Sequence, residues 1–219
     1  MLRVAGFVGV ALARTTTEDC LVPPIIENFN AEAFSGIWWN LAGYPERYLP
    51  NEPDGSDGKC IELFYDFDAE KSRIDVNNTS INPTKDGLWA KTWTTGYAYQ
   101  DFERTAPNLL FVDFIDEYTP EDAPYYPNYW VLDTDYDEYA AGMNCYRLNA
   151  THTNTQFWIL GREPSFVESK KFETIVLKAE DEWNMCPEDF VFRYNYDCEY
   201  DFVAGNPTGP KKIARSPRK

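Results

Sequence analysis

The feature that most constrains this chain is a succession of short strand-like segments with no helical segment between them. Eight segments rich in apolar, aromatic and β-branched residues follow one another, separated by turns and loops. They cover residues 37–44, 60–67, 73–81, 88–99, 109–115, 125–133, 138–148 and 155–161. Parallel strands need long crossover connections, usually helices, and the sequence offers none between these segments. The order therefore predicts an all-β fold, an eight-stranded antiparallel up-and-down barrel, with a β-sandwich as the alternative.

The pattern changes once, near the C-terminus. Residues 165–182 carry apolar side chains close to helical spacing, and Pro164 precedes them as a helix start allows. Ser165 and Glu168 fit a capping box. Residues 190–198 then resemble a short strand. We expect one C-terminal helix and a short final strand after the barrel.

Both ends of the chain differ from this body. A positive start at Arg3, a short apolar run and the Ala11-Leu12-Ala13 site predict a secretory signal peptide over residues 1–13. The run is too short to span a bilayer, and no later run is long enough for a membrane helix. Residues 204–219 form a basic tail for which we expect disorder. The barrel domain is then residues 14–203.

The charge of the body argues against nucleic-acid binding. The formal net charge is −16, from 20 basic and 36 acidic residues. Leaving out Arg3 and the five basic residues of 211–219 gives 14 basic against 36 acidic residues, a net charge of −22 for the body. Such a surface repels phosphate backbones.

The titratable residues do not form a recognisable catalytic or metal-binding set. The single histidine, His152, lies in the loop between two predicted strands, which argues against charge-relay catalysis and a multi-histidine metal site. The acidic run Asp133, Asp135, Asp137 and Glu138 lacks the glycine and late glutamate of an EF-hand loop and fits a turn better. We therefore predict that the protein is not an enzyme and holds no metal.

A secreted chain with five cysteines has room for two disulfides and leaves one cysteine over. N-glycosylation sequons begin at Asn77, Asn78 and Asn149, and the two adjacent asparagines would compete for one glycan.

Three separated motifs carry a family resemblance. They are Gly36-Ile37-Trp38, then Thr134-Asp135-Tyr136, and finally the run that ends at Gly161-Arg162. In this order, with strand-like segments between them, they resemble the three signature regions of the lipocalin family. The surrounding residues are similar to apolipoprotein D, the insect bilin-binding proteins and the crustacyanin subunits. The resemblance covers nearly the whole chain between the signal peptide and the basic tail.

The resemblance implies structural roles for these residues. Trp38 would plug one end of the barrel with Arg162 stacked on it, a cation–π contact of about 0.5–2 kcal/mol. The implied disulfides are Cys20–Cys145 and Cys60–Cys198. Cys186 is then the odd cysteine, and Cys60–Cys186 is a rival pairing.

Candidate ligand-binding residues follow from strand parity, since alternate side chains share one face. An inward-pointing Trp38 favours the following set. These residues are Asn40, Ala42, Tyr44, Tyr65, Trp93, Tyr97, Phe111, Tyr129, Met143 and Phe157. The open end of the barrel would be framed by the loops 45–58, 82–86, 116–124 and 149–155. A one-residue error in register moves a whole strand's set to the other face.

The resemblance implies a secreted binding and transport protein that holds one small hydrophobic ligand in the barrel and requires no cofactor. A carotenoid or bilin pigment, a retinoid, a sterol and a fatty acid all fit the residues. A carotenoid is long for one barrel, so it implies a homodimer or heterodimer that shares the ligand. Two alternatives stay open: a lipid-modifying lipocalin enzyme that uses Cys186, and an interaction protein whose barrel is filled by side chains.

Overall fold

We describe the protein from a computed structural model. The structure describes residues 14–16, 19–44, 59–83, 89–100, 106–114, 128–147, 149–196 and 198. The expected signal peptide, the basic tail and most of the expected open-end loops lie outside these ranges. Among the described residues, no helix has the length and apolarity that crossing a bilayer would take.

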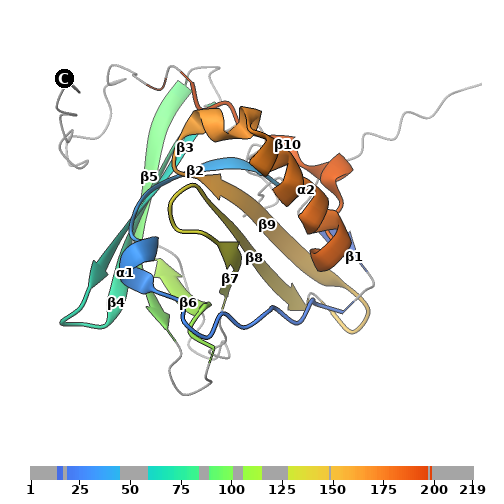
Figure 1. The fold of residues 1–219 in the computed structure, drawn as a ribbon, viewed down its shortest axis with the longest axis horizontal. Helices are drawn as coiled ribbons and strands as arrows, with labels where there is room; N and C mark the ends of the chain where they lie inside the picture. Colours follow the sequence, from blue (N-terminus) through green and yellow to red (C-terminus); the bar gives the residue numbers. More distant parts are fainter. Residues whose placement is uncertain are drawn as a thin grey trace, which may run out of the picture.

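Eight strands form a closed antiparallel barrel, which confirms the predicted fold (Figure 1). Each strand pairs with the next, and the last pairs with the first. The strands are β2 Gly36–Gly43, β3 Lys59–Asp68, β4 Arg73–Pro83, β5 Trp89–Gln100, β6 Leu109–Phe114, β7 Tyr129–Thr134, β8 Tyr139–Arg147 and β9 Thr153–Gly161. Two short strands extend the sheet, β1 (Arg14–Thr16) on β9 and β10 (Val191–Phe192) on β2.

The helical elements are short except for α2 (Lys170–Trp183). A single turn, α1 (Ala31–Phe34), leads into β2, and the 3₁₀ helices η3 (Pro164–Glu168) and η4 (Pro187–Asp189) flank α2. The predicted helix therefore begins later than expected. The Oγ atom of Ser169 accepts from the N–H of Phe172 at 3.0 Å and caps α2, so the capping box placed at Ser165 was wrong.

One apolar cluster lies inside the barrel, toward one end. Its members come from all eight barrel strands, and side chains from every strand of a closed barrel can form one cluster only in the interior. The strand members are Trp38, Tyr65, Ile74, Val76, Ala98, Leu110, Val131, Ala140 and Leu160. Two further members come from the segment before β2. Phe29 lies in the N-terminal lead-in, residues 19–30, and Phe34 lies in α1. We call this set the inner cluster.

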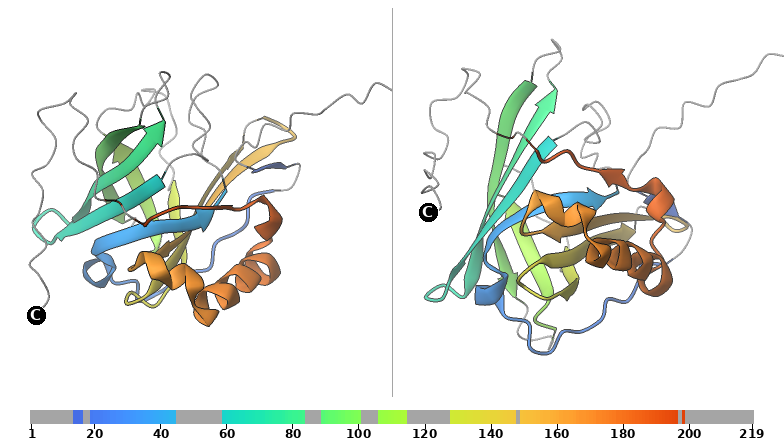
Figure 2. Two further views of the ribbon diagram at one scale, coloured as in Figure 1. Left: turned by 90° about the horizontal axis from the view of Figure 1, so that it is seen from above. Right: turned by 45° about the horizontal axis from the view of Figure 1, so that its top comes forward.

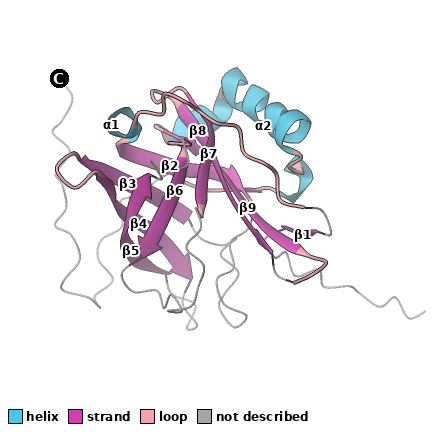
Figure 3. Cartoon of the chain, turned by 90° about the horizontal axis from the view of Figure 1, so that it is seen from below, coloured by secondary structure: helices cyan, strands magenta, loops and turns pink. Residues whose placement is uncertain are grey.

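Helix α2 lies against the outside of the barrel wall (Figures 2 and 3). A second apolar cluster packs between this helix and the wall. The helix contributes Phe172, Ile175, Ala179 and Trp183, spaced at three and four residues, so they form one apolar face. This face packs on side chains of the strands beneath it. They are Trp39, Leu41, Ala42, Leu132, Ala141, Met143, Cys145, Phe157 and Ile159. We call this set the outer cluster.

Both disulfides implied by the resemblance are formed. Cys20–Cys145 ties the lead-in to β8, and Cys60–Cys198 ties the C-terminal segment to β3, with Cα–Cα distances of 5.7 and 5.6 Å. They span 125 and 138 residues along the chain, so each stabilises the fold by about 2–5 kcal/mol in the chain-entropy account. Cys186 belongs to neither bridge, so the rival pairing with Cys60 is not formed.

Candidate functional site

The barrel is closed at the end where the inner cluster lies. Trp38 is fully buried there, and its indole N–H donates to the carbonyl oxygen of Phe34 at 2.8 Å. The guanidinium of Arg162 covers the indole, with its Cζ atom 3.6 Å from the ring centroid. The sequence motif thus forms the plug that the resemblance implied.

Arg162 also holds three separate segments together at this end. Its guanidinium donates to the carbonyl oxygens of Ala33, Ile37 and Tyr136 at 3.1, 3.0 and 2.9 Å. Burial lowers the pKa of Arg162, while the nearby carboxylates of the turn at 135–137 oppose the shift. Gly36 has a φ of +101°, and a Cβ there would lie 3.1 Å from a guanidinium nitrogen. Glycine is therefore required beside the plug.

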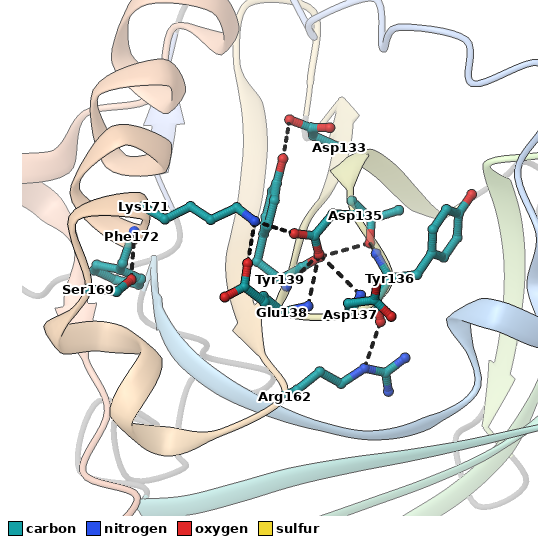
Figure 4. Close-up of polar contacts among 11 residues, drawn as sticks. Asp133, Asp135, Tyr136, Asp137, Glu138, Tyr139, Arg162, Ser169, Lys171 and Phe172 are labelled. Atoms are coloured by element: carbon teal, nitrogen blue, oxygen red, sulfur yellow. Dashed lines mark hydrogen bonds and ion pairs between the residues drawn. The ribbon is translucent and has the colours of Figure 1, made fainter.

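The turn between β7 and β8 is built around Asp135 (Figure 4). One oxygen of its carboxylate accepts from the backbone N–H groups of Asp137, Glu138 and Tyr139, at 3.2, 2.9 and 3.0 Å. The hydroxyl of Thr134 donates to the carbonyl of Tyr139 at 2.8 Å. The second motif is thus a turn whose side chains satisfy its own backbone.

Lysines of α2 pair with the acidic run that flanks this turn, and Figure 4 shows the contacts of one of them, Lys171. Lys171 contacts both Asp135 and Glu138, and Lys178 donates to Asp133 at 2.7 Å. Burial raises the pKa of Asp135, but Lys171 and the backbone N–H groups outweigh it and hold that pKa below its usual value. The acidic residues therefore attach α2 to the barrel. Within the described ranges, no three potential metal ligands gather into one site.

Above the inner cluster, the inward-facing side chains remain partly accessible to solvent. Strand pairing identifies them, because they alternate in phase with members of the inner cluster. They are Leu63, Asn78, Ser80, Thr94, Val112, Phe114, Tyr129, Asn144, Gln156 and Trp158. These residues point into a closed barrel, and the surrounding side chains do not cover them completely. This inner wall is the candidate site.

The structure separates the predicted binding residues between the two faces of the sheet. Asn40, Tyr65 and Tyr129 face the interior. Four residues lie in the outer cluster instead, namely Ala42, Tyr44, Met143 and Phe157. Three others alternate out of phase with the inner cluster and so face outward, namely Trp93, Tyr97 and Phe111. Tyr97 lies there beneath Arg73, whose Cζ atom is 3.7 Å from the ring centroid.

A β-bulge explains the error on β2. Asn40 pairs with Leu160, but the next residue in register with β9 is Ala42 rather than Leu41. The extra residue reverses the alternation, so Trp38 and Asn40 face inward while Ala42 and Tyr44 face the outer cluster. Strand parity counted from Trp38 fails beyond this point.

The most prominent inward residue that parity counting missed is Trp158. Its ring stacks on Tyr129 at 5.6 Å between centroids, with the two planes 22° apart. Gly142 makes this possible, since a Cβ there would lie 2.8 Å from the hydroxyl of Tyr129. The sequence signal that could have identified Trp158 as inward-facing was its alternation with Asn154 and Gln156 along β9.

The lead-in is held by a buried asparagine that the sequence did not single out. Asn108 is fully buried, and its carboxamide accepts from the N–H of Ile26 and donates to the carbonyls of Pro24 and Val131. It anchors the lead-in against β7 and takes no part in the inner wall.

Comparison with known proteins agrees with this geometry. The model of the lipocalin-like domain matches residues 29–187. Apolipoprotein D of Rattus norvegicus is 31% identical over 157 residues, 68% of this chain and 73% of the relative. Insecticyanin-B of Manduca sexta is 26% identical over 170 residues, 74% of this chain and 75% of the relative.

Two solved structures have the same fold. Insecticyanin from the tobacco hornworm superposes with a TM-score of 0.60 at 19% identity, covering 86% of this chain and 93% of that one. Apocrustacyanin C1 has a TM-score of 0.58 at 19% identity, covering 82% and 90%.

Proposed function

Because this chain belongs to the lipocalin family, whose members bind small hydrophobic molecules, we propose that it is a secreted binding and transport protein that holds one such molecule inside its barrel. The observation that carries the proposal is the contrast along the inner wall. One end is plugged by Trp38 under Arg162, whereas the inward residues above it are partly exposed. Apolar surface placed there leaves water at about 25 cal/mol per Å².

The ligand classes compatible with this interior are carotenoid and bilin pigments, retinoids, sterols and fatty acids. Similarity to crustacyanin and insecticyanin motivates the pigment version. A carotenoid would extend beyond one barrel, so that version also requires a dimer. Tyr129 and Trp158, stacked on the inner wall, are the aromatic surface that we expect the apolar part of the ligand to contact.

The two disulfides support secretion, since such bridges persist in oxidising compartments. The alternative of an enzyme that uses Cys186 has less support. The backbone N–H of that residue donates to the hydroxyl of Tyr44 at 2.7 Å, on the side of the wall that carries the outer cluster. The partial exposure of inward residues likewise weighs against a barrel filled by side chains.

Titration with the apolar fluorescent probe N-phenyl-1-naphthylamine tests the proposal on the oxidised, full-length protein. We expect saturable binding of one probe per barrel, with displacement by at least one ligand class. An absorption spectrum and solvent extraction of protein purified from its source would then identify the class. The absence of saturable binding by correctly folded protein would refute the proposed function, and a colourless protein with extractable lipid would refute the pigment version.

A further inference from the structure

The C-terminal segment 191–196 continues the barrel wall where β2 and β3 separate. These two strands pair over only part of their length, and β10 takes the place of β3 beside the rest of β2. The segment then bonds to both strands. The N–H of Arg193 donates to the carbonyl oxygen of Leu41 at 2.8 Å, and the N–H of Cys60 donates to the carbonyl oxygen of Tyr194 at 2.9 Å. The segment is therefore part of the wall, with one face toward the interior.

Alternation along this segment places Arg193 on the interior side. Phe192 pairs with Ala42 of the outer cluster, and its ring centroid lies 6.3 Å from that of Phe172 on α2, so Phe192 faces outward. Phe192 and Tyr194 are 57% and 52% exposed, whereas Arg193 between them is 7% exposed. Successive side chains of a strand point to opposite faces, so Arg193 faces the interior.

Two buried asparagines adjoin this position. The carboxamide of Asn195 donates to the carbonyl oxygen of Asn40 at 2.7 Å and accepts from the N–H of Ile61 at 3.1 Å, which holds the segment between β2 and β3. Asn40 is 2% exposed and alternates inward with Trp38, and its carboxamide oxygen has no hydrogen-bond partner. A buried polar atom without a partner is unfavourable, so this point of the wall favours a polar part of the ligand over an apolar one.

Arg193 brings a positive charge to a wall that is otherwise neutral over most of its circumference. Among the described residues of β4 to β9, the side chains in phase with the inner cluster are uncharged. A guanidinium has five N–H donors in a planar fork, so that of Arg193 can bind ligand oxygens in addition to its contacts within the protein. Its attraction for a carboxylate is stronger in a buried site than in water, and two parallel N–H···O bonds fix the orientation.

We propose that the ligand is an amphiphilic acid whose carboxylate binds the guanidinium of Arg193, beside Asn40 on the inner wall. Its apolar body contacts the stacked rings of Tyr129 and Trp158. This inference rests on the proposed function and narrows it. Fatty acids, retinoic acid and bilins carry carboxylates and become the favoured classes, whereas sterols and retinol do not.

A matched pair of retinoids tests the inference on the oxidised wild-type protein. Retinoic acid and retinol share one apolar body and differ only in the polar group. In competition with N-phenyl-1-naphthylamine at pH 7.4, we expect retinoic acid to bind with a Kd at least about tenfold lower, a difference of about 1.4 kcal/mol. Equal affinity, or tighter binding of retinol, overturns the inference and leaves the proposed function intact. Failure of both retinoids and of the probe to bind folded protein instead refutes the proposed function, and the inference with it.

Two charge-matched pairs of variants locate the carboxylate site. Arg193→Gln and Lys91→Gln each remove one cation, but Lys91 is exposed on β5. Asn40→Asp and Asn149→Asp each add one carboxylate, but Asn149 is exposed in the β8–β9 loop.

We expect Arg193→Gln and Asn40→Asp to reduce the preference for retinoic acid by about tenfold or more, and the two exposed controls to leave it unchanged. The first variant removes the guanidinium, and the second places a carboxylate of the protein beside it. An unchanged preference in folded Arg193→Gln, or an equal loss in Lys91→Gln, overturns the assignment of Arg193. Asn40→Asp is nearly isosteric, so its comparison with Asn149→Asp decides the question if Arg193→Gln does not fold.

Discussion

Phe157 and Trp158 are neighbours in sequence, but they lie on opposite faces of the barrel wall. Phe157 is fully buried in the outer cluster, with ring centroids 5.3 Å from Phe190, 6.0 Å from Trp183 and 6.3 Å from Tyr44. Truncating a buried phenylalanine costs about 3–5 kcal/mol. For a domain of this size each kcal/mol lowers the Tm by about 2–4 °C, so Phe157→Ala should lower it by about 6–20 °C.

The matched variant is Trp158→Ala. This residue is only partly buried and stacks on Tyr129 at the inner wall, so we expect a smaller loss of stability and a larger loss of affinity for N-phenyl-1-naphthylamine. Thermal unfolding followed by circular dichroism and probe titration well below the Tm of each variant measure the two effects. If Phe157→Ala weakens probe binding while Trp158→Ala does not, the assignment of faces along β9 is reversed and the reasoning fails.

Three further predictions concern the closed end, the turn and the wall of the barrel. Arg162→Lys keeps the charge but loses the guanidinium group that donates hydrogen bonds to three carbonyl oxygens. The free energy of unfolding measured in urea should therefore fall by about 1.5–3 kcal/mol. An unchanged value would mean that these hydrogen bonds add no stability. The folded pKa of Asp135 is lowered, so its contribution is present above the unfolded pKa of about 3.9 and is lost as pH falls through the folded value. Asp135→Asn should therefore be less stable at neutral pH and lose less stability on acidification, and an equally steep acid loss would contradict this. Asn78 points into the barrel whereas Asn149 is exposed in the β8–β9 loop, so glycopeptide mass spectrometry of secreted protein should find a glycan on Asn149, and a glycan on Asn78 would contradict the inward placement.

Most of the fold could be predicted because its signals are local. Alternation along each strand and the absence of crossover helices indicated the eight strands and their antiparallel order. The helix start was misplaced because Ser165 and Ser169 are both plausible caps by sequence. Only Ser169 has its hydroxyl 3.0 Å from the N–H of Phe172. The disulfides followed from the family resemblance, since five cysteines alone left several pairings open.

The binding residues were harder to predict, because both faces of the wall are apolar where α2 covers it. Met143 and Phe157 are apolar residues of the kind that line ligand cavities, but they lie outside the barrel under α2. Alternation separates two sets of residues without saying which set faces inward.

The sequence by itself determined the strands and their order, since these depend on local pattern, and its resemblance to the lipocalin family implied the plug formed by Trp38 and Arg162. The tertiary structure decided which face of each strand lines the interior. The bulge between Asn40 and Ala42 reverses the alternation on β2, and the position of α2 makes one apolar face the outside. Both depend on contacts between segments far apart in the chain, which no local pattern contains.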